Sequence, residues 1–202
     1  MKLSTTFLVC VLFAFTSLVN ATDEEYNLAV QLIQERKFEQ ALPLFKKLSN
    51  EGDRDAQNNL GAMFQHGHGV PVDLRKAAYW YLKSAEKGSS IAQHNIGIAY
   101  YYGQGVTKNK EEGLAWVLIS IGGGVTQSEA VAKRMKSQMT QQQVTRASER
   151  LMELNKKYGI FLQKNFNYKF SSVEEKYFKS ISNIKFDFIK QKLRKKQKPS
   201  LL

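Results

Sequence analysis

The chain has 202 residues, of which 43% are hydrophobic and 24% charged, so a folded domain with a buried core is expected rather than a disordered chain. It has one cysteine, Cys10, which excludes an intrachain disulfide framework and a zinc site built from several thiolates. The net charge of +12 is unevenly placed. Residues 22–154 hold 16 basic and 15 acidic residues, whereas residues 155–202 hold 13 and 3. Electrostatic arguments about partners therefore concern the C-terminal segment.

Residues 1–21 have the pattern of a secretory signal peptide. Lys2 precedes an apolar run over residues 3–19, and Asn20-Ala21 is followed at once by acidic residues. We therefore expect cleavage after Ala21, secretion across an inner membrane, and a periplasmic or extracellular mature protein. The alternative is an uncleaved membrane anchor, because a run of about 17 residues lies near the lower limit for spanning a bilayer.

Residues 22–53 show two apolar stripes at helical spacing on either side of a short turn at Arg36-Lys37. This pattern predicts a helical hairpin without a glycine loop. The first stripe contains Tyr26, Ala29, Val30 and Ile33, and the second contains Phe38, Ala41, Leu44, Phe45 and Leu48.

Residues 54–90 and 91–125 are two copies of a 36-residue repeat. Each copy predicts two helices joined by a glycine-containing loop, with an aspartate or asparagine capping the second helix. A single hairpin cannot bury its own apolar face, so the copies are expected to stack. The repeated structural positions are Ala56, Leu60, Gly61, Phe64, Gly67, Gly69, Ala77, Trp80 and Gly88, then Ala92, Ile96, Gly97, Tyr100, Gly103, Gly105 and Trp116.

This spaced set resembles the Sel-1-like repeat family, a relative of the tetratricopeptide repeat, and the hairpin over residues 22–53 resembles a tetratricopeptide hairpin. The resemblance implies an all-α fold, an α/α solenoid with a right-handed superhelix. It also implies a non-enzymatic protein-interaction scaffold of the bacterial envelope or secreted fraction. The second copy departs from the pattern at Glu112, Gly113 and Ile121. An enzymatic alternative comes from cysteine-rich family members linked to β-lactam binding or hydrolysis, but this chain lacks their paired cysteines.

Residues 126–157 are predicted to close the array with capping helices. Thr126-x-x-Glu129 and Thr140-x-x-Gln143 match the capping-box pattern, which places helices at about 127–139 and 141–157. We expect these helices to cover the last apolar face of the repeats.

Residues 158–202 form a basic, aromatic tail. Val173, Tyr177, Ile181, Ile184 and Phe188 recur at helical spacing, and the end of the tail is expected to be disordered. Three interpretations remain open. The helix packs on the solenoid, or residues 176–198 attach to an anionic membrane or envelope polymer. The third, binding of nucleic acid, is not expected of a secreted protein.

The candidate binding site is the concave face of the solenoid, which the first helix of each hairpin lines. Asn and Gln side chains there can hydrogen-bond to the backbone of an extended segment of an unknown peptide or protein, although simple solvation explains them equally well. No catalytic, cofactor or metal site is predicted. His66 and His68 flank a glycine loop without further ligands. The candidate positions are Gln57, Asn58, Gln65, Gln93, His94, Tyr101 and Tyr102.

We predict that the mature protein begins at Thr22, because signal peptidase recognises the small residue at Ala21. N-terminal sequencing of protein exported by its host tests this. An intact Met1 terminus on the exported protein would contradict cleavage.

Overall fold

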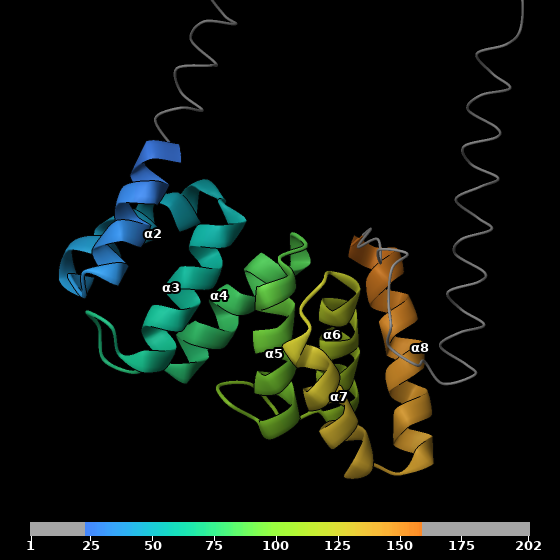
Figure 1. Ribbon diagram of the computed structural model, residues 1–202. Coiled ribbons are helices and arrows are strands. Elements are labelled where there is room, and N and C mark those ends of the chain that lie inside the picture. The colour runs from blue at the N-terminus through green and yellow to red at the C-terminus, as the bar shows by residue number, and fades with distance from the viewer. Residues whose placement is uncertain (1–22, 159–202) are drawn as a thin grey trace, which may run out of the picture.

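Residues 23–158 are described by the computed structural model and form eight helices that follow one another as antiparallel hairpins (Figure 1). This arrangement confirms the predicted all-α fold. No helix among these residues is long and apolar enough to cross a membrane. The predictions for the signal peptide over residues 1–21 and for the tail beyond Tyr158 lie outside the described residues. The helices are residues 23–34, α2 Phe38–Glu51, α3 Arg54–His66, α4 Leu74–Glu86, α5 Ser90–Tyr102, α6 Lys110–Gly122, α7 Gln127–Ser137 and α8 Gln141–Tyr158.

Short polar side chains start most of these helices. Asp73 accepts a hydrogen bond from the Lys76 amide as the sequence predicts, and Asp53, Ser89 and Asn109 act in the same way. The Thr140 capping box is also confirmed. The Thr140 amide donates to Gln143 Oε1 at 3.0 Å, and the Gln143 amide donates to Thr140 Oγ1 at 3.3 Å.

The predicted capping box at Thr126 is wrong. Thr126 already has right-handed helical backbone angles, φ −62° and ψ −33°, and its side chain makes no capping bond. An N-cap residue needs an extended backbone to direct its hydroxyl at the first free amides. The helix nevertheless begins where the sequence predicted, and α8 ends one residue later than predicted.

Helix α6 is the centre of the packing. Ten of its 13 residues are buried, because α5, α7 and α8 all lie against it. Trp116 on α6 is 1% exposed, as expected for a core residue. The equivalent Trp80 on α4 is only partly buried, and Tyr81 provides the buried ring of that helix instead. The difference arises because α8 covers α6, whereas α4 and α6 are scarcely in contact.

The glycine loops seat each hairpin on the one before it. Gly69 and Gly105 both have positive φ, at 68° and 75°. A Cβ on Gly69 would lie 2.9 Å from the carbonyl oxygen of Phe38, and one on Gly105 would overlap that of Leu74. Phe38 and Leu74 are the first residues of α2 and α4. Each loop therefore rests on the start of the preceding hairpin's second helix, where a side chain has no room.

We predict that Gly105→Ala destabilises the fold by clearly more than Gly124→Ala. Both glycines have positive φ, so both substitutions cost about 1–2 kcal/mol of backbone strain. Only Gly105 adds a clash with neighbouring backbone, because no atom lies within 4 Å of a Cβ on Gly124. Urea unfolding of the two variants measures the difference. Equal losses would show that loop seating contributes nothing.

Candidate functional site

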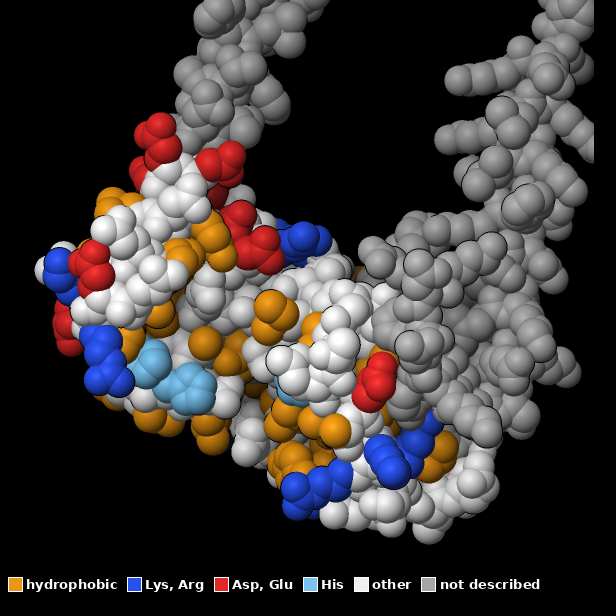
Figure 2. Space-filling view, in the orientation of Figure 1, with side chains coloured by type: hydrophobic (Ala, Val, Ile, Leu, Met, Phe, Trp, Pro, Cys, Tyr) orange, Lys and Arg blue, Asp and Glu red, His pale blue; other side chains and the backbone are white. Residues whose placement is uncertain are grey.

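The first helix of each hairpin leaves one stripe of residues outside the core, and together these stripes form what we call the A-helix face. On α5 the stripe is Ile91, Asn95, Ile98 and Tyr102, of which Ile91 is 58% and Tyr102 48% exposed. Hydrophobic side chains gather over α5 in the middle of Figure 2. One repeat earlier the stripe is Asp55, Asn59, Ala62 and His66, and one repeat later it is Gln127, Val131, Arg134 and Gln138.

Three of the predicted binding residues are not on this face. Gln57, Gln93 and Tyr101 are 4%, 1% and 2% exposed, so the expectation that they face a partner is wrong. Gln57 Nε2 donates to the Ser49 carbonyl at 3.0 Å, and Gln93 Nε2 donates to the Ala85 carbonyl at 3.3 Å. The reason is that a first helix is packed on two sides, as α5 is by both α4 and α6. Its buried stripe is therefore wider than one amphipathic face.

Asn58, Gln65, His94 and Tyr102 do lie on or beside the A-helix face. Asn58 and Gln65 are half-buried and accept hydrogen bonds, from Asn95 Nδ2 at 3.2 Å and from the Tyr81 hydroxyl at 2.8 Å. Burial raises the pKa of Tyr81, so its hydroxyl stays a proton donor. These contacts hold the amides in place at the surface between successive hairpins.

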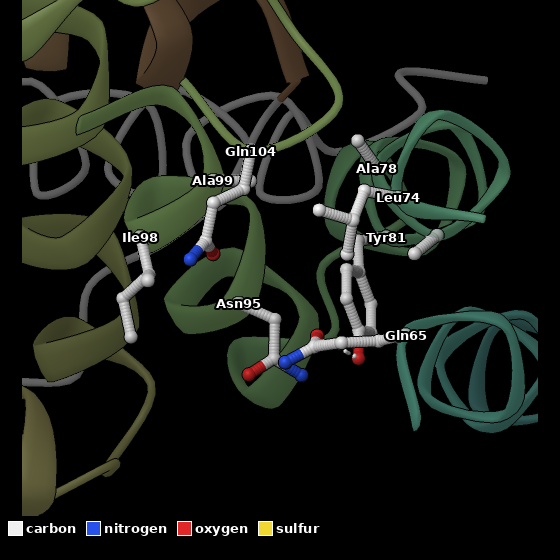
Figure 3. A pocket seen from close by; sticks show the side chains of 9 residues that line it. Gln65, Leu74, Ala78, Tyr81, Asn95, Ile98, Ala99 and Gln104 are labelled. Atoms are coloured by element: carbon white, nitrogen blue, oxygen red, sulfur yellow. Dashed lines mark hydrogen bonds between the residues drawn. The ribbon is translucent and has the colours of Figure 1, made fainter. Parts of the chain in front are cut away.

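A small pocket opens between α3, α4 and α5. Gln65 and Asn95 point toward one another at one side of it, and Leu74, Ile98 and Gln104 lie around it (Figure 3). Its volume of about 40 Å³ suits a single small side chain. A pocket that combines apolar side chains with a few fixed amides can bind an extended peptide segment through both its side chains and its backbone.

His94 connects three helices through buried hydroxyls. Its Nδ1 lies 2.6 Å from Ser128 Oγ, and Ser128 Oγ lies 2.7 Å from Ser120 Oγ. Ser120 in turn donates to the Val117 carbonyl at 2.7 Å. Ser120 and Ser128 are 0% exposed, so neither hydroxyl is open to a substrate. The contact links α5 to α7 and α6, and burial lowers the pKa of His94.

Sequence analysis missed three basic residues near Tyr101 and Gly103, which flank Tyr102 in the sequence. Lys108 and Lys110 come from the α5–α6 loop and the start of α6, and Arg134 comes from α7. The 36-residue period could have indicated Arg134, because it places this residue on the first helix of the next hairpin, at the position equivalent to Ile98. Among residues 23–158, no group of three or more His, Cys, Asp or Glu side chains could hold a metal ion.

The hairpin architecture defines the chain as an α/α repeat protein, and comparison with known proteins gives the family. The Sel1 repeat model matches residues 54–89 and 90–121. The two copies over these residues are Sel1 repeats, and the described part of the chain has the SLR fold. No curated protein matches it.

Two solved structures are similar to the chain over most of its length. One is c5321, a protective antigen present in uropathogenic Escherichia coli strains that displays an SLR fold. It is 26% identical over 75% of this chain and 35% of its own, with a TM-score of 0.65. The other is a Sel1 repeat protein from Oxalobacter formigenes, 26% identical over 63% of this chain and 54% of its own, with a TM-score of 0.52. This chain therefore spans about a third and about half of these two proteins.

We predict that His94 makes the fold less stable in mild acid. Its pKa is lowered in the folded state, so between pH 7 and pH 5 the unfolded chain takes up a proton more readily than the folded one. Stability is then lost as pH falls, by at most about 1.4 kcal/mol per pH unit. Urea unfolding of His94→Asn, the residue found at this position in the first repeat, should show a shallower loss.

Ser128→Ala is the control for this prediction. It removes the hydrogen-bond partner but leaves His94 buried, so it should lower stability at both pH values and keep the wild-type slope. Identical slopes in wild type and His94→Asn would show that His94 does not couple folding to pH.

Proposed function

We propose that this chain is a non-enzymatic interaction scaffold that binds a peptide or protein segment on the A-helix face. The observation that carries the proposal is the α5 stripe, which exposes Ile91 and Tyr102 at its two ends, with half-buried Asn95 and Ile98 between them. Ile91 and Tyr102 each leave about half of their surface uncovered by the stack, and we take this exposed apolar surface as the mark of an intermolecular contact. The amides of Asn58, Gln65 and Asn95 supply fixed polar groups beside them.

A binding role fits the chemistry of this face better than a catalytic one. The Ser128–His94 contact resembles a nucleophile and its base, but the serine is fully buried. We therefore propose that the chain binds its partner without altering it.

We further propose that the scaffold acts outside the cytoplasm, in the periplasm or the secreted fraction. The apolar run over residues 3–19 supports this location. The similar c5321 is described as a protective antigen, and we take this description as support for a location outside the cytoplasm. Attachment to an anionic envelope surface through residues 176–198 stays a prediction of the sequence.

Site-specific photo-crosslinking tests the binding face. A benzophenone amino acid is placed at Tyr102 on the A-helix face or at Tyr79 on α4, which are 48% and 53% exposed tyrosines. In the native host we expect a discrete adduct from the Tyr102 position and none from the Tyr79 position. Equal adducts from both positions, or none from either, would contradict a binding site on the A-helix face.

A further inference from the structure

Basic and aromatic side chains converge at the C-terminal end of α5. Lys110 Nζ lies 5.6 Å from the centre of the Tyr101 ring, and the Tyr101 and Tyr102 rings meet edge to face at 5.0 Å. Lys108 packs beside Gly103, directly after Tyr102. Burial raises the pKa of the Tyr101 hydroxyl, and the charge of Arg134 on α7 acts on it in the opposite direction. We call Tyr102, Lys108, Lys110 and Arg134 the basic aromatic site.

Tyr101 fixes the position of this site. Its hydroxyl donates to the Met135 carbonyl at 3.2 Å and to Gln138 Oε1 at 3.3 Å, so α5 is held against α7. Lys110 Nζ donates to the Gln138 carbonyl at 3.2 Å from the other side. Tyr102 and Arg134 are thus presented on adjoining helices, with their side chains exposed to solvent.

The site is not part of the repeated framework. In the first repeat, Val72 and Leu74 occupy the positions of Lys108 and Lys110, and His66 occupies that of Tyr102. Likewise, Ile98 occupies the position that is equivalent to Arg134 one repeat earlier. The positions that hold the hairpins together repeat, so the accumulation of positive charge here is not required for stacking.

The positive charges of the site are not neutralised within the described chain. Across residues 23–158, no carboxylate forms an ion pair with Lys108, Lys110 or Arg134. The acidic residues nearest to Lys108 and Lys110 in the sequence, Glu111 and Glu112, pair with Arg146 and Arg150 of α8. In Figure 2, basic side chains lie beside hydrophobic ones at the lower edge of the face.

We propose that the basic aromatic site binds an acidic segment of a partner protein, in which an aromatic or large apolar residue adjoins one or two carboxylates. The inference rests on the proposed function and specifies its partner. The apolar residue packs on Tyr102 and Ile98, while the carboxylates pair with Arg134 and Lys108. Complementary charge favours such a partner and disfavours the chain's own tail, because residues 155–202 carry 13 basic and only 3 acidic residues.

The probe is a fluorescein-labelled peptide with Phe-Asp-Glu in a Gly/Ser background, titrated against the full mature chain. We expect saturable binding that weakens as salt rises from about 50 mM to about 500 mM. The matched peptide with Phe-Asn-Gln should bind at least about tenfold more weakly, because it lacks the charges but keeps the shape. An equal affinity for both peptides, or no binding of Phe-Asp-Glu, overturns the proposal.

Two charge-removing variants locate the site on the protein. Arg134→Gln and Lys108→Gln should each weaken binding of Phe-Asp-Glu by about tenfold. Lys46→Gln removes the same charge from an exposed position on α2 and should bind as the wild type does. Equal effects from all three variants would mean that only net charge matters, which overturns the site.

Two further results separate this proposal from others. Thermal melts of the variants should match the wild type, since none of the three side chains is buried. Crosslinking from Tyr102 in the host without binding of the acidic peptide would refute the acidic partner and leave the scaffold function intact. Absence of both the crosslink from Tyr102 and the binding of the acidic peptide would refute the scaffold function as well as the acidic partner. The chain could instead bind a second copy of itself through its acidic residues 23–25. Sedimentation would then detect self-association that Arg134→Gln abolishes, and this result would replace the partner protein with a second copy of the chain.

Discussion

The close approach of α5 and α6 at two glycines is the constraint on which the rest of the structure depends. A Cβ on Gly97 would lie 2.9 Å from the Gly113 carbonyl oxygen, and one on Gly113 would lie 2.7 Å from the Gly97 carbonyl oxygen. Backbones this close leave little space between the two helices, so α6 is drawn into the interior and its apolar residues are covered on several sides. Gly113 departs from the alanine of the family pattern, and this contact is the physical reason. The equivalent pair in the first repeat, Gly61 and Ala77, is less tight, with a Cβ on Gly61 lying 3.2 Å from the Ala77 carbonyl oxygen.

Burial of α6 also determines how the array closes. Glu112 stands where the first repeat has Lys76, and its carboxylate accepts hydrogen bonds from Trp116 Nε1 at 2.9 Å and from Arg150 of α8. The hydrogen bond to Glu112 raises the pKa of Arg150, so the guanidinium stays charged. Tyr158, at the end of α8, donates to Glu86 at 2.6 Å and packs against Trp116. The departure at Glu112 is therefore an adaptation of the last repeat to a different neighbour.

Local features were predictable from the sequence because their causes are local. The Asp73 cap, the positive-φ glycines and the helix limits depend on a few adjacent residues, and the 36-residue period shows which positions share an environment. The sequence predictions failed at positions whose burial depends on a helix outside their own hairpin. Trp80 and Trp116 occupy equivalent positions, but only Trp116 is covered by α8. Gln57 and Gln93 are polar, yet they are buried because they satisfy carbonyls of the preceding hairpin. The basic aromatic site escaped prediction because its residues come from α5, a loop and α7, and only the fold brings them together.

Repetition separates two kinds of residue in this chain. Positions that recur with the period contact the preceding hairpin, as Gly69 and Gly105 do through their loops and Gln57 and Gln93 do through their amides. Positions that break the period fall into two groups. Glu112 and Gly113 face inward and adjust the packing around α6, whereas Lys108, Lys110 and Arg134 carry positive charge near the C-terminal end of α5. Since stacking is approximately a sum of nearest-neighbour contacts, residues outside those contacts can change with little effect on stability. Surface positions of this second group are therefore where a repeat protein can acquire a partner while its framework stays the same.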